Sequence, residues 1–151
     1  MAYSVQDIAN WILLRNKCEE AMEGGDFISN LKLQKLLYYA QGSYLALKDE
    51  PLFNEEIEAW TYGPVVPEVY HKFKGYGSNG IDTSEISMEL NQIDDEAKKI
   101  LEEVYDVFGQ YSASKLVKMT HEEAPWKNTQ KNCVIDKDLI KKYFKENYLE
   151  S

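Results

Sequence analysis

The chain contains very little cysteine: among 151 residues only Cys18 and Cys133 carry a thiol, and they lie far apart in the sequence. Two isolated cysteines provide neither a zinc-ligand spacing nor the disulfide framework of a small secreted domain. The sequence also lacks an apolar run near the roughly 20 residues that a membrane-spanning helix needs. Its first residues lack the basic and apolar regions of a signal peptide. We therefore expect a cytoplasmic protein that binds no metal and has no membrane segment.

Positive charge is scarce as well. The chain has 17 Lys and Arg residues against 26 Asp and Glu residues, a net charge of −9. Because nucleic-acid binding draws its affinity from cations that neutralise phosphates, we expect no direct contact with DNA or RNA. Acidic residues gather between Asp49 and Asp106, and lysines are frequent after Lys115. A basic protein could dock on the acidic middle, but a solvated surface that keeps the protein soluble explains these charges without a partner.

Familiar catalytic motifs are absent. The sequence has no Gly-rich dinucleotide fingerprint, no phosphate-binding loop and no nucleophile elbow. Of the two histidines, His121 is the better acid–base candidate because Glu122 and Glu123 follow it, although a histidine near a helix C-terminus also caps carbonyl groups. We favour this structural role, and a hydrolase that uses His121 is the weaker alternative. We interpret the carboxylates at positions 55, 56 and 58 as solvated acids, and we expect no enzyme activity and no cofactor.

What the sequence does contain is the pattern of one helical domain, which we expect to cover residues 1–151. Ser4 is placed to cap a first helix that ends near Met22, before Gly24 and Gly25. Ser29 caps a longer helix, about Asn30–Leu47, whose two apolar rows predict burial on most sides: Leu33, Leu36, Leu37, Ala40, Tyr44 and Leu47, and Leu31, Tyr38 and Leu45. We expect this helix to be the centre of the core, with the amino groups of Lys32 and Lys35 reaching solvent.

Three further helices follow later in the chain. Asp94 or Asp95 caps one that stops at Gly109, and Ser112 caps a short one that Pro125 limits. In the short helix we expect three buried side chains: Leu116, Val117 and Met119. Asp136 caps the last helix, whose apolar surface is supplied by Leu139, Ile140, Tyr143, Phe144 and Tyr148.

The segment from Ile57 to Phe73 combines a strand, a turn and a helix. Alternating side chains predict a strand over Ile57–Tyr62 that ends at Gly63 and Pro64, and Pro67 suits the first turn of a helix that reaches Gly75. Residues 81–90 alternate weakly, and at most they form a short strand that pairs with Ile57–Tyr62. The fold class is therefore mainly α: a compact bundle of about six helices around a central helix, with a small β element near Ile57–Tyr62.

Aromatic residues are abundant, with 3 tryptophans and 11 tyrosines. Each ring can be a core residue whose polar end is satisfied, but Tyr and Trp also dominate the hot spots of protein interfaces. Taken together with the missing catalytic motifs, this supply favours a binding protein over an enzyme.

Three sequence blocks resemble the Panacea domain family, the phage-associated GepA-like and SocA-like antitoxins. The blocks are Leu31–Gln41, the run from Ile57 to Tyr70 that contains Tyr-Gly-Pro-Val-Val-Pro, and Leu116 with Thr120-His121-Glu122 and Pro125-Trp126. The positions that carry the resemblance, and hence the expected structural or partner-binding residues, are Gln34, Lys35, Tyr38, Trp60, Tyr62, Gly63, Pro64, Tyr70, Thr120, His121, Pro125 and Trp126. Among them we expect Gly63, Pro64 and Trp126 to be mostly structural.

The resemblance implies a helical domain that neutralises a cognate toxin by direct contact, with the toxin encoded by the adjacent gene in a chromosome, prophage or phage. Related proteins also act as adaptors that deliver a bound protein to an ATP-dependent protease, which is the alternative function. The family brings no catalytic activity and no cofactor. Some relatives carry an extra DNA-binding or zinc segment, but this chain lacks the length and the cysteine spacing for one.

Overall fold

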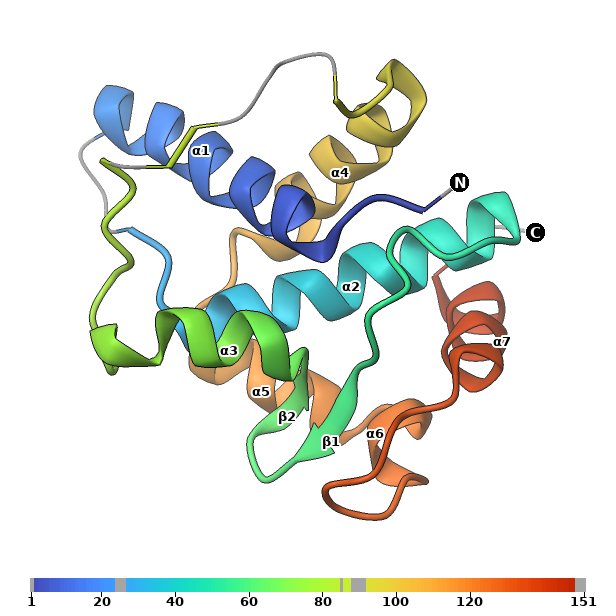
Figure 1. Cartoon of the computed structure of the whole chain (residues 1–151). Helices are drawn as coiled ribbons and strands as arrows, with labels where there is room; N and C mark the ends of the chain where they lie inside the picture. The colour runs from blue at the N-terminus through green and yellow to red at the C-terminus, as the bar shows by residue number, and fades with distance from the viewer. Residues whose placement is uncertain (1, 24–26, 85, 88–91, 149–151) are drawn as a thin grey trace.

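The structure is a computed structural model that describes residues 2–23, 27–84, 86–87 and 92–148, and it confirms the mainly α fold (Figure 1). In chain order the elements are α1 (Val5–Glu23), α2 (Asn30–Lys48), β1 (Glu58–Trp60), β2 (Gly63–Val65), α3 (Pro67–Phe73), the 3₁₀ helix η1 (Lys74–Tyr76), α4 (Asp95–Phe108), α5 (Ala113–His121), α6 (Ala124–Lys127) and α7 (Lys137–Asn147). The glycines expected to end the first helix, Gly24 and Gly25, lie outside the described residues. None of the described helices has the length and hydrophobicity required to cross a bilayer.

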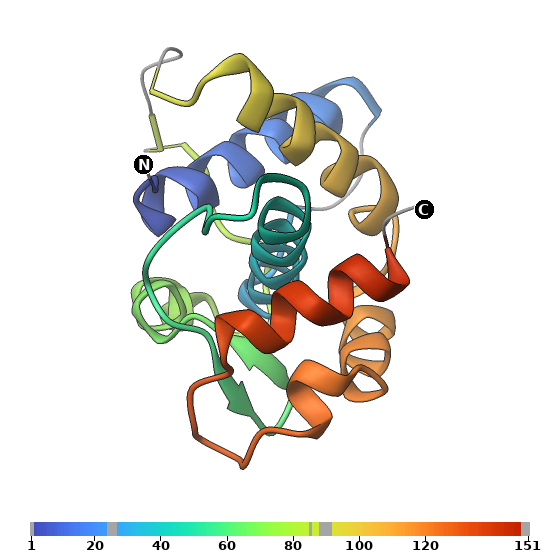
Figure 2. The same ribbon diagram turned by 90° about the vertical axis from the view of Figure 1, so that its right-hand side faces the viewer.

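Helix α2 is the central element, as its two apolar rows predict. It packs against α1, α3, α4, α5, α7 and β2. Figure 2 views α2 nearly end-on, with α1 and α4 on one side and α3, α5 and the β-hairpin on the other. Only Leu31 and Leu47, near its two ends, remain exposed among its predicted apolar positions. The buried Gln41 fits the core because its amide oxygen accepts the Leu52 N–H at 2.8 Å and its amide group donates to the Phe53 carbonyl at 2.8 Å.

The predicted caps account for where the helices begin. Ser29, Asp94 and Ser112 each accept a hydrogen bond from the backbone N–H three residues ahead, and Asp136 accepts from the N–H two residues ahead. These bonds satisfy donors that have no partner within the helix. Two details of α5 differ from the expectation: Val117 and Met119 are half-buried rather than buried, and Pro125 lies inside the separate helix α6.

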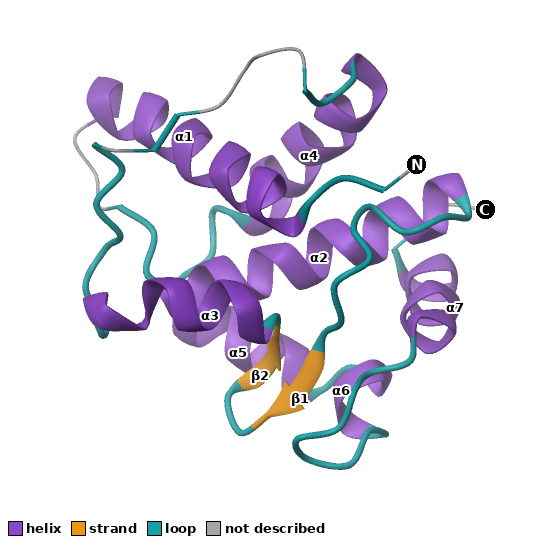
Figure 3. Cartoon of the chain, viewed as in Figure 1, coloured by secondary structure: helices purple, strands orange, loops and turns teal. Residues whose placement is uncertain are grey.

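The β element is a hairpin, shown in orange in Figure 3. The predicted strand is shorter than expected, because Thr61 and Tyr62 form a two-residue turn that connects β1 to β2. Gly63 and Pro64 therefore do not end the sheet; they belong to its second strand, with Trp60 paired to Gly63. A proline is tolerated there because β2 is an edge strand, where a missing N–H breaks no ladder.

The predicted pairing of residues 81–90 with β1 is wrong. The edge of β1 that faces away from β2 is already occupied by the chain before α7. There the Ala59 N–H donates to Cys133 O at 3.0 Å, and the Ile135 N–H donates to Ile57 O at 2.8 Å. Residues 81–84 and 86–87 contain no strand, and the remainder of that segment lies outside the described residues. Ile81 instead donates to the Ile28 carbonyl at 2.8 Å, which joins this segment to the chain before α2.

Candidate functional site

The three blocks that carry the family resemblance meet at the β-hairpin. From α2, the Lys35 amino group donates to the Pro64 carbonyl at 2.9 Å, and the Gln34 amide oxygen accepts the Val66 N–H at 2.9 Å. From α6, the indole N–H of Trp126 donates to the Trp60 carbonyl at 2.8 Å. The first and third blocks are thus both bonded to the middle one, although they lie far apart in the sequence.

Gly63 lies where the hairpin packs tightly against α2 and α5. Its φ of +112° lies in a region that L side chains rarely adopt. A Cβ built at this position would lie 2.8 Å from Lys35 Cε and 2.8 Å from Thr120 Oγ1. Thr120 itself is fixed because its hydroxyl donates to the Val117 carbonyl at 2.8 Å. Backbone conformation and space therefore both require glycine between α2 and α5.

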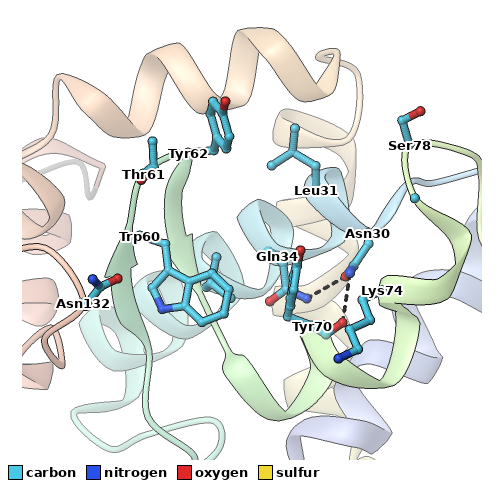
Figure 4. Close-up of a pocket in the computed structure, with 12 residues that line it drawn as sticks. Asn30, Leu31, Gln34, Trp60, Thr61, Tyr62, Tyr70, Lys74, Ser78 and Asn132 are labelled. Atoms are coloured by element: carbon cyan, nitrogen blue, oxygen red, sulfur yellow. Dashed lines mark hydrogen bonds between the residues drawn. The ribbon is translucent and has the colours of Figure 1, made fainter.

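An open pocket of about 480 Å³ lies beside the hairpin, and we call it the aromatic pocket (Figure 4). Its walls come from α2, the hairpin, α3, η1 and the loop after it, and the segment before α7. The lining residues are Asn30, Leu31, Gln34, Trp60, Thr61, Tyr62, Val65, Tyr70, Lys74, Gly77, Ser78 and Asn132. Of the predicted site residues, Gln34, Trp60, Tyr62 and Tyr70 are thus brought together around one cavity.

The aromatic pocket has a fixed polar framework. The Gln34 side chain donates to Asn30 Oδ1 at 2.9 Å, and the Asn30 amide group donates to the Tyr70 carbonyl at 3.0 Å, as the dashed lines in Figure 4 show. The Trp60 indole N–H donates to Glu58 Oε1 at 2.9 Å, and the Trp60 ring meets Tyr70 edge-on with 5.0 Å between centroids. Contacts within the chain therefore hold these side chains in place.

Lys35 is fully buried, so the expectation that its amino group reaches solvent is wrong. The hairpin covers the end of the side chain, which finds the Pro64 carbonyl instead of water. Burial penalises the charged ammonium and lowers the pKa of Lys35 to about 7. The hydrogen bond to Pro64 and the packing of its methylene groups favour the buried position of Lys35. Burial of its positive charge, in contrast, destabilises the folded state.

We expect the free energy of unfolding to rise by about 2 kcal/mol between pH 7 and pH 9 through Lys35 alone. In this range the unfolded chain still holds the Lys35 proton while the folded chain releases it, so an increase in pH favours the folded state. Urea unfolding at several pH values measures the effect, which should be absent in Lys35→Met. The exposed Lys99 provides the control variant Lys99→Met, and equal pH slopes in wild type and Lys35→Met would contradict the prediction.

Tyr38 lies away from the pocket, at a buried carboxylate. Its hydroxyl donates to Glu123 Oε1 at 2.9 Å, and the Tyr39 hydroxyl donates to Glu123 Oε2 at 2.9 Å. The Tyr148 hydroxyl, from the end of α7, also donates to Oε2. We call this group the Glu123 cluster. Burial raises the pKa of Glu123, although the three hydroxyl donors oppose the shift.

Glu123 is predicted from the sequence only as a possible partner of His121, and its place in the core was missed. The available signal was the pair Tyr38-Tyr39 in a helix predicted to be buried on most sides, because two buried hydroxyl groups need acceptors. A neighbouring carboxylate in a short loop between helices meets that need. The cluster is thus a structural element of the core, and none of its residues lines the aromatic pocket.

The ring of His121 packs against a neighbouring aromatic side chain. It stacks on Trp126 with 4.0 Å between ring centroids. Its Nε2 atom is buried and has no hydrogen-bond partner among the described residues, and both Glu123 oxygens are taken by tyrosine hydroxyls. Pro125, also predicted as a site residue, is buried in α6, where its carbonyl accepts the Thr129 hydroxyl at 2.7 Å. Neither His121 nor Pro125 lines the aromatic pocket.

Comparison with known proteins identifies the family. A family model described as "Antitoxin SocA-like, Panacea domain" matches residues 33–127. The chain belongs to the SocA-like Panacea family. One curated relative, "Antitoxin SocA" of Caulobacter vibrioides (strain NA1000 / CB15N), is 38% identical over 109 residues, which is 66% of this chain and 58% of the relative. The chain therefore matches less than two thirds of that relative's length, and no solved structure matches it.

The Panacea match covers the hairpin and most of the pocket, but not all of it. Asn30, Leu31 and Asn132 line the pocket but lie outside residues 33–127. Tyr148, a member of the Glu123 cluster, also lies outside this range. Among the described residues of this Panacea protein, no group of three or more His, Cys, Asp or Glu side chains is placed to hold a metal ion.

Proposed function

We propose that this protein is an antitoxin that neutralises a cognate protein toxin by direct binding. The observation that carries the proposal is membership of the SocA-like Panacea family, together with 38% identity to a protein named Antitoxin SocA. The toxin would be the product of the adjacent gene. The match covers 58% of the relative. The test of the antitoxin role therefore uses this chain and its own neighbouring gene.

The site supports a role in protein contact. Hydrogen bonds within the chain hold the walls of the aromatic pocket, and Tyr62 at its rim is 66% exposed. Tyrosine and tryptophan supply large contact areas with few rotatable bonds, which is why they recur at interface hot spots. A preorganised pocket also lowers the entropy that binding would otherwise cost.

Co-expression tests the proposal. The protein from the adjacent gene is produced from an inducible promoter, alone or together with this chain, and colony formation is counted. We expect growth to stop with the neighbour alone and to recover with this chain, and we expect the two proteins to elute as one complex in size-exclusion chromatography. A copy of this gene with an early frameshift is the control. A neighbour that is harmless alone, or growth arrest that persists beside this chain, would reject the proposal for this pair.

A further inference from the structure

We infer that the aromatic pocket receives an extended segment of a protein partner that inserts a large apolar or aromatic side chain beside Trp60 and places a carboxylate on Lys74. The inference rests on the proposed function, since it names the chemistry of the toxin segment that the antitoxin would hold. It commits to a protein segment that is locally anionic, which the net charge of −9 does not suggest by itself.

The apolar part of the inference follows from the rings and their exposure. Trp60 and Tyr70 are half-buried and form the wall of the pocket. Tyr62 and Leu31 stand at the rim with exposures of 66% and 37%, and Figure 4 shows both on the same side of Trp60. A small ligand inside the cavity would leave these rim side chains uncovered, whereas a protein segment with its own surface would cover them.

The charge of the pocket differs from that of the chain. Although the chain has 26 acidic residues, none of the twelve lining residues is Asp or Glu, and Lys74 is the one member of that set with a charged side chain. Lys74 is exposed, and within the described ranges no carboxylate lies within 4.0 Å of its amino group. A cation that has no carboxylate within ion-pair distance among the described residues favours a locally anionic segment through charge complementarity.

The ends of the pocket suit a peptide backbone. Figure 4 places Asn132 on one side of Trp60, and Ser78 and Lys74 on the other. An amide and a hydroxyl can both donate and accept hydrogen bonds, as the N–H and C=O groups of an extended chain require. The volume of about 480 Å³ falls within the range of roughly 300–1,000 Å³ that is usual for ligand pockets.

Three small probes with one phenyl ring test the chemistry without any toxin: N-acetylphenylalanine, which is anionic, its neutral amide, and the cation phenethylamine. Each is titrated into the full chain while the indole N–H signal of Trp60 is followed by NMR, with Trp11 as the internal reference. We expect the anion to bind about two- to fivefold more tightly than the amide, and the cation to bind weakest. Lys74→Glu should remove or invert this order, whereas Lys99→Glu, the same charge change on α4, should preserve it.

Equal affinities for the three probes, or an unchanged Trp60 signal, would overturn the inference. The co-expression assay separates its failure from that of the proposed function. If wild type rescues growth and both Tyr62→Ala and Lys74→Glu rescue equally well, the pocket is not the binding site although the antitoxin role stands. If wild type does not rescue but the probes bind in the expected order, the antitoxin role fails and the pocket chemistry stands.

Discussion

Replacement of Gly63 by alanine is expected to lower the free energy of unfolding by about 2–6 kcal/mol. One contribution is backbone strain of about 1–3 kcal/mol, because φ is +112° at this position. The other is overpacking of about 1–3 kcal/mol, since the new methyl group would meet Lys35 and Thr120 at 2.8 Å. Neither neighbour can retreat easily: Lys35 is bonded to the Pro64 carbonyl, and Thr120 is held on α5.

Urea unfolding followed by circular dichroism measures this loss. Gly75→Ala is the matched control, because a Cβ there meets no atom within 4 Å and its φ is not positive. We expect the control to change stability by less than about 0.5 kcal/mol. A Gly63→Ala protein as stable as wild type would show that the hairpin can move away from α2 and α5, and that the pocket wall is not fixed there.

The helices could be predicted from the sequence because the signals that begin them are local. Ser29, Asp94, Ser112 and Asp136 each carry a side-chain oxygen that reaches an N–H two or three residues away. Such bonds depend on neighbours in the chain and not on the tertiary fold. The central position of α2 could also be predicted, because a helix with apolar residues on most sides must pack against other elements on most sides.

The sheet was harder to predict from the sequence, because tertiary contacts determine which segments its strands pair with. Gly63 and Pro64 are typical of a turn, yet they form a strand because α2 supplies a donor for the Pro64 carbonyl. The second neighbour of β1 is the segment around Cys133, more than 70 residues away in the chain. The alternation in residues 81–90 suggested a nearer partner, but alternation indicates only that a segment can be extended, not what it pairs with.

The family resemblance selected residues that meet at the hairpin, but it did not indicate their separate contacts. Adjacent residues of α2 illustrate the difference: Gln34 lines the pocket, whereas Lys35 is buried beneath the hairpin. Tyr38, one turn further, donates to Glu123 in the core and does not line the pocket. A single helical block therefore serves the pocket, the hairpin and the core, so the loss of binding in a variant must be compared with its stability.

Replacement of Glu123 by alanine is expected to cost about 3–5 kcal/mol of stability, because the hydroxyls of Tyr38, Tyr39 and Tyr148 lose their common acceptor. Each buried donor left without a partner costs about 1–3 kcal/mol, and partial solvation of Tyr148, which is 39% exposed, reduces its share. Thermal and urea unfolding measure the change, with the exposed Glu122→Ala as the control.

The acid side of the stability profile gives a second measurement on the same residue. Because burial raises the pKa of Glu123 in the folded chain, the folded state holds this proton at pH values where the unfolded state has released it. Stability from this group is therefore fully present below 4.5, the ordinary pKa of a glutamate, and is lost as the pH rises through the folded pKa. Glu123→Gln, which cannot titrate, should lack this decline. A variant that unfolds at the same urea concentration as wild type and keeps the same pH dependence would show that the three tyrosines do not depend on Glu123.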